Sequence, residues 1–191
     1  MIILKTALNV MVCLFPLSEI ALAFVKRARR TSQVTVEDRG SMRLIWITVA
    51  CAVTLAIICS SYELIPIAES STSLRIIALV FLGGGLSLRW VAILTLGSLF
   101  TVNVAIASNH KVFDSGPYRY VRHPSYTGLL LAFLGLGVFL NSWLGIASLM
   151  IPISIAVAYR IRVEESALHN ALGTAYSDYC ERRKRLIPGL Y

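Results

Sequence analysis

Long apolar runs separated by short polar stretches set the pattern of this 191-residue chain. A helix needs about 20 apolar residues to cross a bilayer, and the runs lie near that length. We therefore predict five membrane-spanning helices, over residues 1–25, 44–66, 74–90, 126–140 and 143–159. Only Asn141 and Ser142 join the last two runs, so we expect these to pair as an antiparallel helical hairpin.

Residues 91–108 form an ambiguous segment, because they are apolar enough to span but alternate β-branched residues in their second half. We expect an interfacial segment, helical at first and then extended, with Arg89 and Trp90 marking the membrane interface. The glycine run at residues 83–85 lacks the preceding strand and the following Lys-Ser/Thr of a phosphate-binding loop. Close packing of helices through small residues explains this run better.

Composition indicates a membrane protein. The chain is 57% hydrophobic and 15% charged, with a mean hydropathy of +0.72. Soluble domains are about half apolar and about a quarter charged. The predicted fold class is an all-α integral membrane protein with one domain, residues 1–191. Residues 1–106 supply the N-terminal spans and the interfacial segment. Residues 107–191 form a catalytic half with the hairpin and a cytoplasmic C-terminal helix.

Charge predicts the orientation in the membrane. The formal charge is +8, and nearly every Lys and Arg is cytoplasmic if the N-terminus is outside and the C-terminus inside. Such residues face anionic lipid rather than nucleic acid. The basic cluster at residues 26–30 follows the first apolar run, which favours a span over a signal peptide. We expect Glu19, within that run, to face the helix bundle, and residues 31–43 to form a cytoplasmic loop.

We interpret the cysteines as small apolar fillers. None forms a C-x-x-C pair, and three lie in apolar runs. The pattern therefore predicts neither a disulfide framework nor a metal site.

A polar, basic stretch with the sequence GPYRYVRHPSYTG occupies residues 116–128. Pro117 and Pro124 each disfavour the α-conformation in the preceding residue and remove a backbone donor. We therefore expect a shaped loop that enters a helix near Pro124. Its donors and aromatic rings at the mouth of a membrane helix are hard to explain by packing alone.

A second cluster, Arg160-x-x-x-Glu164-Glu165, lies where the last span is expected to meet the cytoplasm. Arg160 and Glu164 share a helix face. Singly, Arg160 fits a snorkelling interfacial arginine, and the glutamates fit a solvated helix start. The hairpin, however, places residues 116–125 beside residues 160–165. Together these groups suit a cationic ligand with a planar base, and a carboxylate or phosphate on a second ligand.

Residues 160–179 are expected to continue the last helix out of the membrane, with a bend at Gly173. Four residues recur at helical spacing and form one apolar stripe. They are Leu168, Leu172, Tyr176 and Tyr179.

These motifs resemble the isoprenylcysteine carboxyl methyltransferases, which are integral membrane enzymes that use S-adenosylmethionine. The resemblance rests on GPYRYVRHPSYTG, the R-x-x-x-E-E helix and the ending Arg185-x-x-Pro188. It implies two catalytic residues: Arg160, which holds the substrate carboxylate, and Glu164, which contacts the cofactor. The cofactor-binding residues that it implies are His110, Lys111, Val112, Phe113, Tyr118, His123, Pro124, Ser125, Tyr126, Glu164 and Glu165.

The implied function is methyl transfer from S-adenosylmethionine to a lipophilic acceptor, the carboxylate of an isoprenylcysteine-like substrate. A carboxylate is ionised at pH 7 and needs no general base. An amine acceptor would need one, with Glu165 or His123 as the candidate. Two alternatives stay open: a phospholipid-amine or small-thiol methyltransferase on the same scaffold, and a non-enzymatic membrane scaffold.

The expected partners are a lipophilic or prenylated substrate and membrane lipid, without nucleic acid. The chain is shorter at its N-terminal end than eukaryotic members of the family. This short form suits a multi-pass protein of a prokaryotic inner membrane.

Overall fold

The computed structural model describes residues 2–25, 34–36, 40–68, 72–97, 105–107 and 112–191. Its α-helices are α1 (Ile2–Val25), α2 (Ser41–Ser61), α3 (Thr72–Leu96), α4 (Pro124–Phe139), α5 (Trp143–Leu172) and α6 (Thr174–Arg182). A 3-10 helix, η2 (Gly116–Arg119), precedes α4. Two short strands, β1 (Val34–Val36) and β2 (Ala105–Ala107), pair antiparallel with Val34 opposite Ala107.

The helices confirm the all-α class. Each predicted span overlaps one helix, from α1 to α5, although α2 ends five residues before the predicted end at Pro66. Among the described residues, α2, α3 and α5 are long and apolar enough to cross a membrane, whereas Thr6–Leu22 of α1 and the whole of α4 are shorter. α3 continues to Leu96 and β2 follows later, so residues 91–108 are helical and then extended in their described parts, as predicted. The partner strand β1 lies in a segment predicted as a loop.

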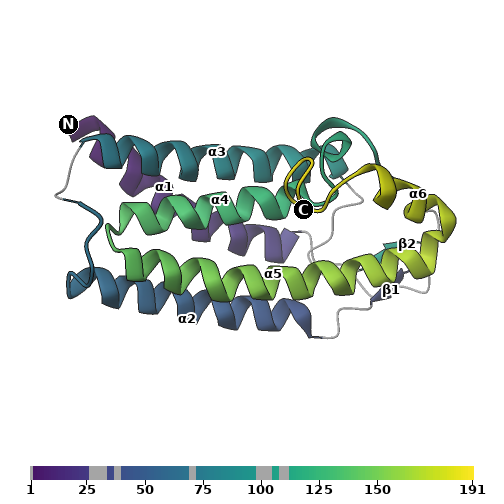
Figure 1. Ribbon diagram of the computed structural model, residues 1–191, viewed down its shortest axis with the longest axis horizontal. Coiled ribbons are helices and arrows are strands. Elements are labelled where there is room, and N and C mark those ends of the chain that lie inside the picture. Colours follow the sequence, from purple (N-terminus) through teal and green to yellow (C-terminus); the bar gives the residue numbers. More distant parts are fainter. Residues whose placement is uncertain (1, 26–33, 37–39, 69–71, 98–104, 108–111) are drawn as a thin grey trace.

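Four helices, α3, α4, α5 and α2, run parallel to the long axis of the molecule and lie side by side in that order (Figure 1). α3 packs on α4, α4 on α5, and α5 on α2, while α1 crosses behind the row and packs on α3. Their apolar side chains meet in one core, in which Phe15 of α1 meets Phe133 of α4 edge to face with 5.0 Å between ring centroids. α4 has buried residues along its whole length, so it is the interior helix of the bundle.

Glycines set the close contact between α3 and α4. A Cβ atom on Gly85 would lie 2.5 Å from the backbone nitrogen of Ala132, and one on Gly128 would lie 2.5 Å from the carbonyl oxygen of Gly85. The backbones can touch here because both positions lack a side chain. The predicted packing role of the glycine run is therefore confirmed at Gly85, whereas a Cβ on Gly84 would meet no atom within 4 Å.

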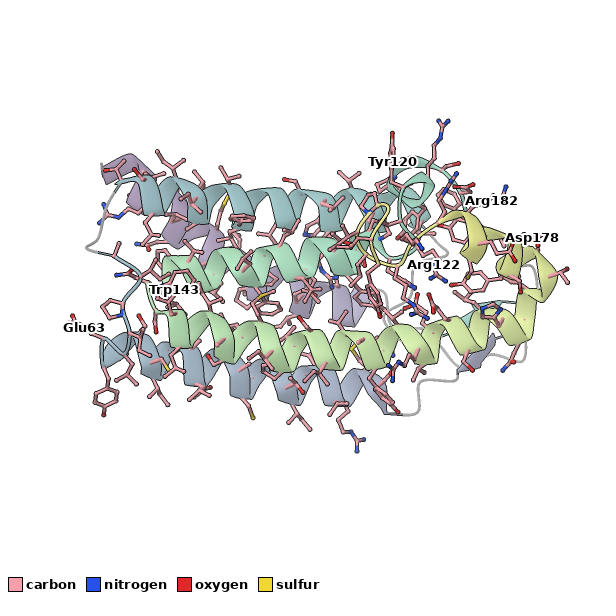
Figure 2. All side chains as sticks on the ribbon, viewed as in Figure 1. Glu63, Tyr120, Arg122, Trp143, Asp178 and Arg182 are labelled. Atoms are coloured by element: carbon pink, nitrogen blue, oxygen red, sulfur yellow. The ribbon has the colours of Figure 1, made fainter. Side chains whose placement is uncertain are left out.

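α4 and α5 form the predicted antiparallel hairpin (Figure 1). In the connection Asn141 is left-handed, with φ 53°, and the Ser142 hydroxyl accepts from the backbone N–H of Gly145 at 3.0 Å. The same hydroxyl donates to the carbonyl of Leu64 at 2.6 Å, which ties the hairpin to the chain after α2. Trp143 lies at this end of the bundle, opposite the end that carries α6 (Figure 2).

At the other end, α5 extends past its neighbours and bends into α6 (Figure 1). Gly173 makes the bend with φ 56° and ψ −130°, as predicted, because glycine adopts a positive φ without a Cβ clash. Tyr176 and Tyr179 of the predicted apolar stripe are buried on α6. This bend turns α6 back over the end of the bundle.

Two charged residues pair inside the bundle. Glu19 on α1 accepts hydrogen bonds from Nε and Nη2 of Arg89 on α3. The prediction that Glu19 faces the bundle is therefore confirmed. Arg89, which the sequence pattern predicts to mark a membrane interface, is only 8% exposed, and its charge is paired with that of Glu19 between the helices.

Candidate active site

The loop that leads into α4 follows a fixed path. Gly116 has φ 57°, and a Cβ there would lie 2.9 Å from Cγ2 of Thr95 on α3. Glycine thus permits both the backbone conformation and the close approach. Pro124 is the first residue of α4, as predicted, and His123 precedes it with a non-helical φ of −128°.

The C-terminal tail runs beside this loop (Figure 1). The N–H of Arg122 donates to the carbonyl of Lys184 at 2.8 Å, and the N–H of His123 donates to the carbonyl of Arg185 at 2.9 Å. Residues 121 and 184 form a parallel bridge next to these bonds. Arg122 and His123 lie between the two prolines and outside any helix, so their backbone N–H groups need partners, and the carbonyl groups of the tail supply them.

Glu165 joins the loop, the tail and α5. Its side chain is buried, and its Oε1 lies 3.0 Å from Nη1 of Arg122 and 3.2 Å from Nε2 of His123. Its Oε2 accepts from Nε and Nη2 of Arg185 at 3.0 and 2.8 Å. Arg122 lies at the end of the bundle that α6 covers (Figure 2). One carboxylate thus binds two guanidinium groups and fixes the positions of three chain segments.

A chain of hydrogen bonds links α2, α5 and α4. The hydroxyl of Tyr126 donates to Oε2 of Glu164 at 3.0 Å and accepts from Nε of Arg160 at 3.3 Å. Nη1 of Arg160 donates to Oγ of Ser41 at 2.6 Å. Arg160 is 1% exposed and Ser41 is fully buried, so this arginine lies inside the bundle and does not snorkel to a surface.

Aromatic rings border this chain. Tyr118 is buried, and Phe113 lies edge-on to it with 5.9 Å between ring centroids. Burial, and next the charge of Glu164, raise the pKa of Tyr118 above its ordinary value, so its phenol stays neutral. The hydroxyl of Tyr179 on α6 donates to the carbonyl of Tyr118 at 2.7 Å and holds η2 against α6.

The predicted meeting of the two clusters is borne out by these contacts. Tyr126 and His123 of the loop reach Glu164 and Glu165, respectively. Pro124 and Ser125 are buried at the start of α4, and Val112 and Phe113 are half-buried before η2. His110 and Lys111 lie outside the described residues.

Sequence reasoning missed several partners of these residues. Ser41 gives no signal, since a serine at the start of a helix is an ordinary capping residue. Arg122 and Arg185 belong to basic stretches in which no pattern distinguishes a buried pair from a solvated charge. Arg185 is part of the R-x-x-P motif, and this motif was the one feature of the sequence that indicated a specific structural role for Arg185.

Metal-ligand chemistry finds no support in the part of the chain that is described. No group of three or more His, Cys, Asp or Glu side chains there could hold a metal ion. All four cysteines are free thiols. The polar groups of the site are instead hydrogen-bonding and charged side chains beside aromatic rings.

The fold and the site together define a helical integral membrane protein with a polar, partly buried site at one end of its bundle. Residues 76–170 match the model of the isoprenylcysteine carboxyl methyltransferase family. This part of the chain, which holds the loop, the hairpin and both predicted clusters, belongs to that family.

Individual relatives agree with the family match. The chain is 32% identical over 103 residues to protein-S-isoprenylcysteine O-methyltransferase B of Arabidopsis thaliana, covering 53% of this chain and 52% of the relative. It is 30% identical over 106 residues to the cobalt-zinc-cadmium resistance protein CzcN of Cupriavidus metallidurans, covering 55% and 49%. The chain thus spans about half the length of these curated relatives.

A solved structure has a similar fold. It is the eukaryotic intramembrane Ras methyltransferase ICMT, with a TM-score of 0.60 and 27% identity, over 76% of this chain and 52% of that one. The predicted family is therefore confirmed by sequence and by fold.

Proposed function

We propose that this chain is a membrane methyltransferase that moves a methyl group from S-adenosylmethionine to a lipophilic acceptor, the carboxylate of an isoprenylcysteine-like molecule. The observation that carries this proposal is the hydrogen-bond chain Arg160–Tyr126–Glu164. It joins the residue that family resemblance assigns to the acceptor with the residue that it assigns to the cofactor. A site for a two-substrate transfer needs these two positions side by side.

The side chains present fit the cofactor. A sulfonium and an amino group are cationic, and Glu164 offers a half-buried carboxylate. An adenine ring suits the aromatic side chains of Phe113, Tyr118 and Tyr126. When bound, S-adenosylmethionine would supply an electrophilic methyl group on a positively charged sulfur. Glu164 and these rings would hold it together with residues 110–112 and 123–125.

Each residue then has a separate task. Arg160 binds the acceptor carboxylate through its guanidinium fork. The neutral hydroxyl of Tyr126 bridges Arg160 and Glu164 and keeps their side chains in one orientation. Glu165 holds the loop and the tail in place, which is a positioning task. Arg160 is buried, so water is excluded from the acceptor side of the site. Without water, the solvent does not stabilise the separate charges of the sulfonium and the carboxylate, and their reaction is favoured.

The geometry favours a carboxylate over an amine acceptor. An amine must lose a proton, and the base candidates are His123 and Glu165. These two residues contact each other at 3.2 Å, and both oxygens of Glu165 are engaged by cationic or imidazole partners. Neither oxygen of Glu165 is therefore free to accept a proton from a substrate, and Nε2 of His123 is directed at Glu165. The small-thiol and lipid-amine alternatives are tested alongside, because the CzcN relative is named for metal resistance and not for isoprenylcysteine.

We propose that five helices span the membrane, with the N-terminus outside and the site on the cytoplasmic side. The support is charge asymmetry: the site end carries Arg122 and Arg182, whereas Glu63 and Trp143 lie at the opposite end (Figure 2). The described parts of the predicted interfacial segment, residues 91–97 and 105–106, then lie at the cytoplasmic interface. A prokaryotic inner membrane suits this arrangement.

The test is transfer of a labelled methyl group by the purified protein. We would offer three acceptors in parallel: an S-prenylated cysteine analogue, vesicles with phosphatidylethanolamine, and a small hydrophobic thiol. The expected product is a base-labile methyl ester on the prenylated cysteine. Label in the lipid amine or the thiol instead would move the assignment to the alternative acceptors. No label in any acceptor would contradict methyl transfer.

A further inference from the structure

An ion pair between two residues that belong to neither predicted cluster lies inside the helix bundle. Glu19 on α1 and Arg89 on α3 form a two-point contact, Nε with Oε1 and Nη2 with Oε2. The two side chains are 16% and 9% exposed. Ionised groups in a membrane bundle are costly to bury and commonly serve a functional site. Packing alone does not require this pair, since apolar side chains of similar volume would fill the same space.

Arg89 also makes a third contact, and this one reaches the site. Its Nη1 donates to the carbonyl oxygen of Ser125 at 3.3 Å. Ser125 is the second residue of α4 and precedes Tyr126. The contact is possible because α3 and α4 touch here: a Cβ on Gly128 would lie 2.6 Å from the backbone nitrogen of Arg89.

The guanidinium geometry makes the Ser125 contact depend on Glu19. The five N–H donors of arginine lie in one plane and at fixed angles. When Nε and Nη2 both bind the Glu19 carboxylate, the plane is fixed and Nη1 can point only toward the first turn of α4. Without Glu19, the side chain of Arg89 would rotate, and this direction would be lost.

We propose that Glu19 and Arg89 are positioning residues that fix the first turn of α4, and with it Ser125 and Tyr126, from the core of the bundle. This inference rests on the proposed function, because its consequence is the placement of cofactor-binding residues. Glu165 fixes the preceding loop from the tail side, so the turn is held between two carboxylate–guanidinium contacts. α1, which lies outside residues 76–170, thus contributes to the site through Glu19.

The decisive variant removes both charges together, as Glu19→Leu with Arg89→Met. Replacing a buried ion pair by apolar side chains is often neutral for folding, so we expect an unchanged thermal midpoint. The contact with Ser125 is nevertheless lost, so affinity for S-adenosylhomocysteine should fall by about tenfold to hundredfold, the worth of one hydrogen bond from a charged donor. The matched control is Ser18→Ala, which removes a hydroxyl that donates to the carbonyl of Phe15 within α1.

The outcomes separate the inference from the proposed function. No binding of S-adenosylhomocysteine by the wild type would overturn the proposed function itself. A binding wild type together with a double variant of equal affinity and turnover would overturn the positioning role alone. A merely structural pair would behave in this second way, because the double variant restores packing.

A conservative variant decides the matter if the double variant does not fold. Arg89→Lys keeps the charge opposite Glu19, but an ammonium is a compact point charge that cannot serve both Glu19 and the Ser125 carbonyl. We expect weaker binding of S-adenosylhomocysteine at an unchanged thermal midpoint. Wild-type affinity in Arg89→Lys would contradict the inference.

Discussion

Replacement of Arg160 by alanine should separate methyl transfer from cofactor binding. Its guanidinium is buried and touches Ser41 and the Tyr126 hydroxyl, while the carboxylate of Glu164 is one further bond away. If Arg160 binds the acceptor carboxylate, its loss leaves that carboxylate unpaired in a dry site.

The structure gives different magnitudes for the two effects. Loss of one partner of a buried, hydrogen-bonded charge pair costs about 2–5 kcal/mol. At about 1.4 kcal/mol per factor of ten, kcat/KM for the acceptor should decrease by a factor that lies between about 30 and several thousand. On the cofactor side, Arg160→Ala removes the bond at 3.3 Å to the neutral hydroxyl of Tyr126. Such a bond is worth about 0.5–1.5 kcal/mol, so cofactor affinity should fall by no more than about tenfold.

The assay compares initial rates of labelled methyl transfer with calorimetric binding of S-adenosylhomocysteine. Arg162→Ala is the matched control, because Arg162 lies on the same helix with an exposed side chain. Arg160→Met, which fills more of the space than alanine, distinguishes loss of charge from loss of packing. Equal losses of transfer and of cofactor binding in Arg160→Ala would refute the acceptor role.

Three further results are expected. Gly85→Ala should lower the free energy of unfolding by about 1–3 kcal/mol, because its Cβ would push α3 away from α4. Gly84→Ala has open space at its Cβ and should leave the free energy of unfolding unchanged. Thermal unfolding in detergent compares the two variants. Ser41→Ala should raise KM for the carboxylate acceptor by about tenfold, because Arg160 loses a hydrogen-bond partner, and should spare the affinity for S-adenosylhomocysteine; an unchanged KM would contradict this. Burial raises the pKa of Tyr179 in the folded protein above its ordinary value of about 10. The neutral hydroxyl therefore contributes its full stabilisation of the folded state below about pH 10, and this contribution is lost as the pH rises above that value. Tyr179→Phe should therefore be less stable than wild type at pH 8 by about 1 kcal/mol, and this difference should vanish near pH 11 in unfolding measurements.

The elements that sequence predicted well are those with a local cause. Pro124 begins α4 because proline fits the first helical turn and little else in a helix. The two-residue connection at Asn141 leaves α4 and α5 no option except antiparallel packing. That hairpin was sufficient to predict that residues 116–125 lie beside residues 160–165, which the contact between His123 and Glu165 confirms.

The contacts that sequence reasoning did not find are long-range and chemically ordinary. Ser41 is 119 residues from Arg160, and nothing in a lone serine predicts a buried guanidinium beside it. Arg185 is one of four consecutive basic residues, yet it is the one that binds Glu165. The pairing of Arg89 with Glu19 was not predicted, because a single arginine in an apolar run has the same pattern whether it faces water or a buried carboxylate.

The central claim is tested most directly by calorimetric binding of S-adenosylhomocysteine to the purified protein. Glu164→Gln and His123→Ala are measured alongside, with Glu181→Gln, an exposed glutamate on α6, as the control. We predict micromolar binding by the wild type and by Glu181→Gln, and loss of binding in the two site variants. No binding by a well-folded wild type would contradict the assignment of a methyltransferase site.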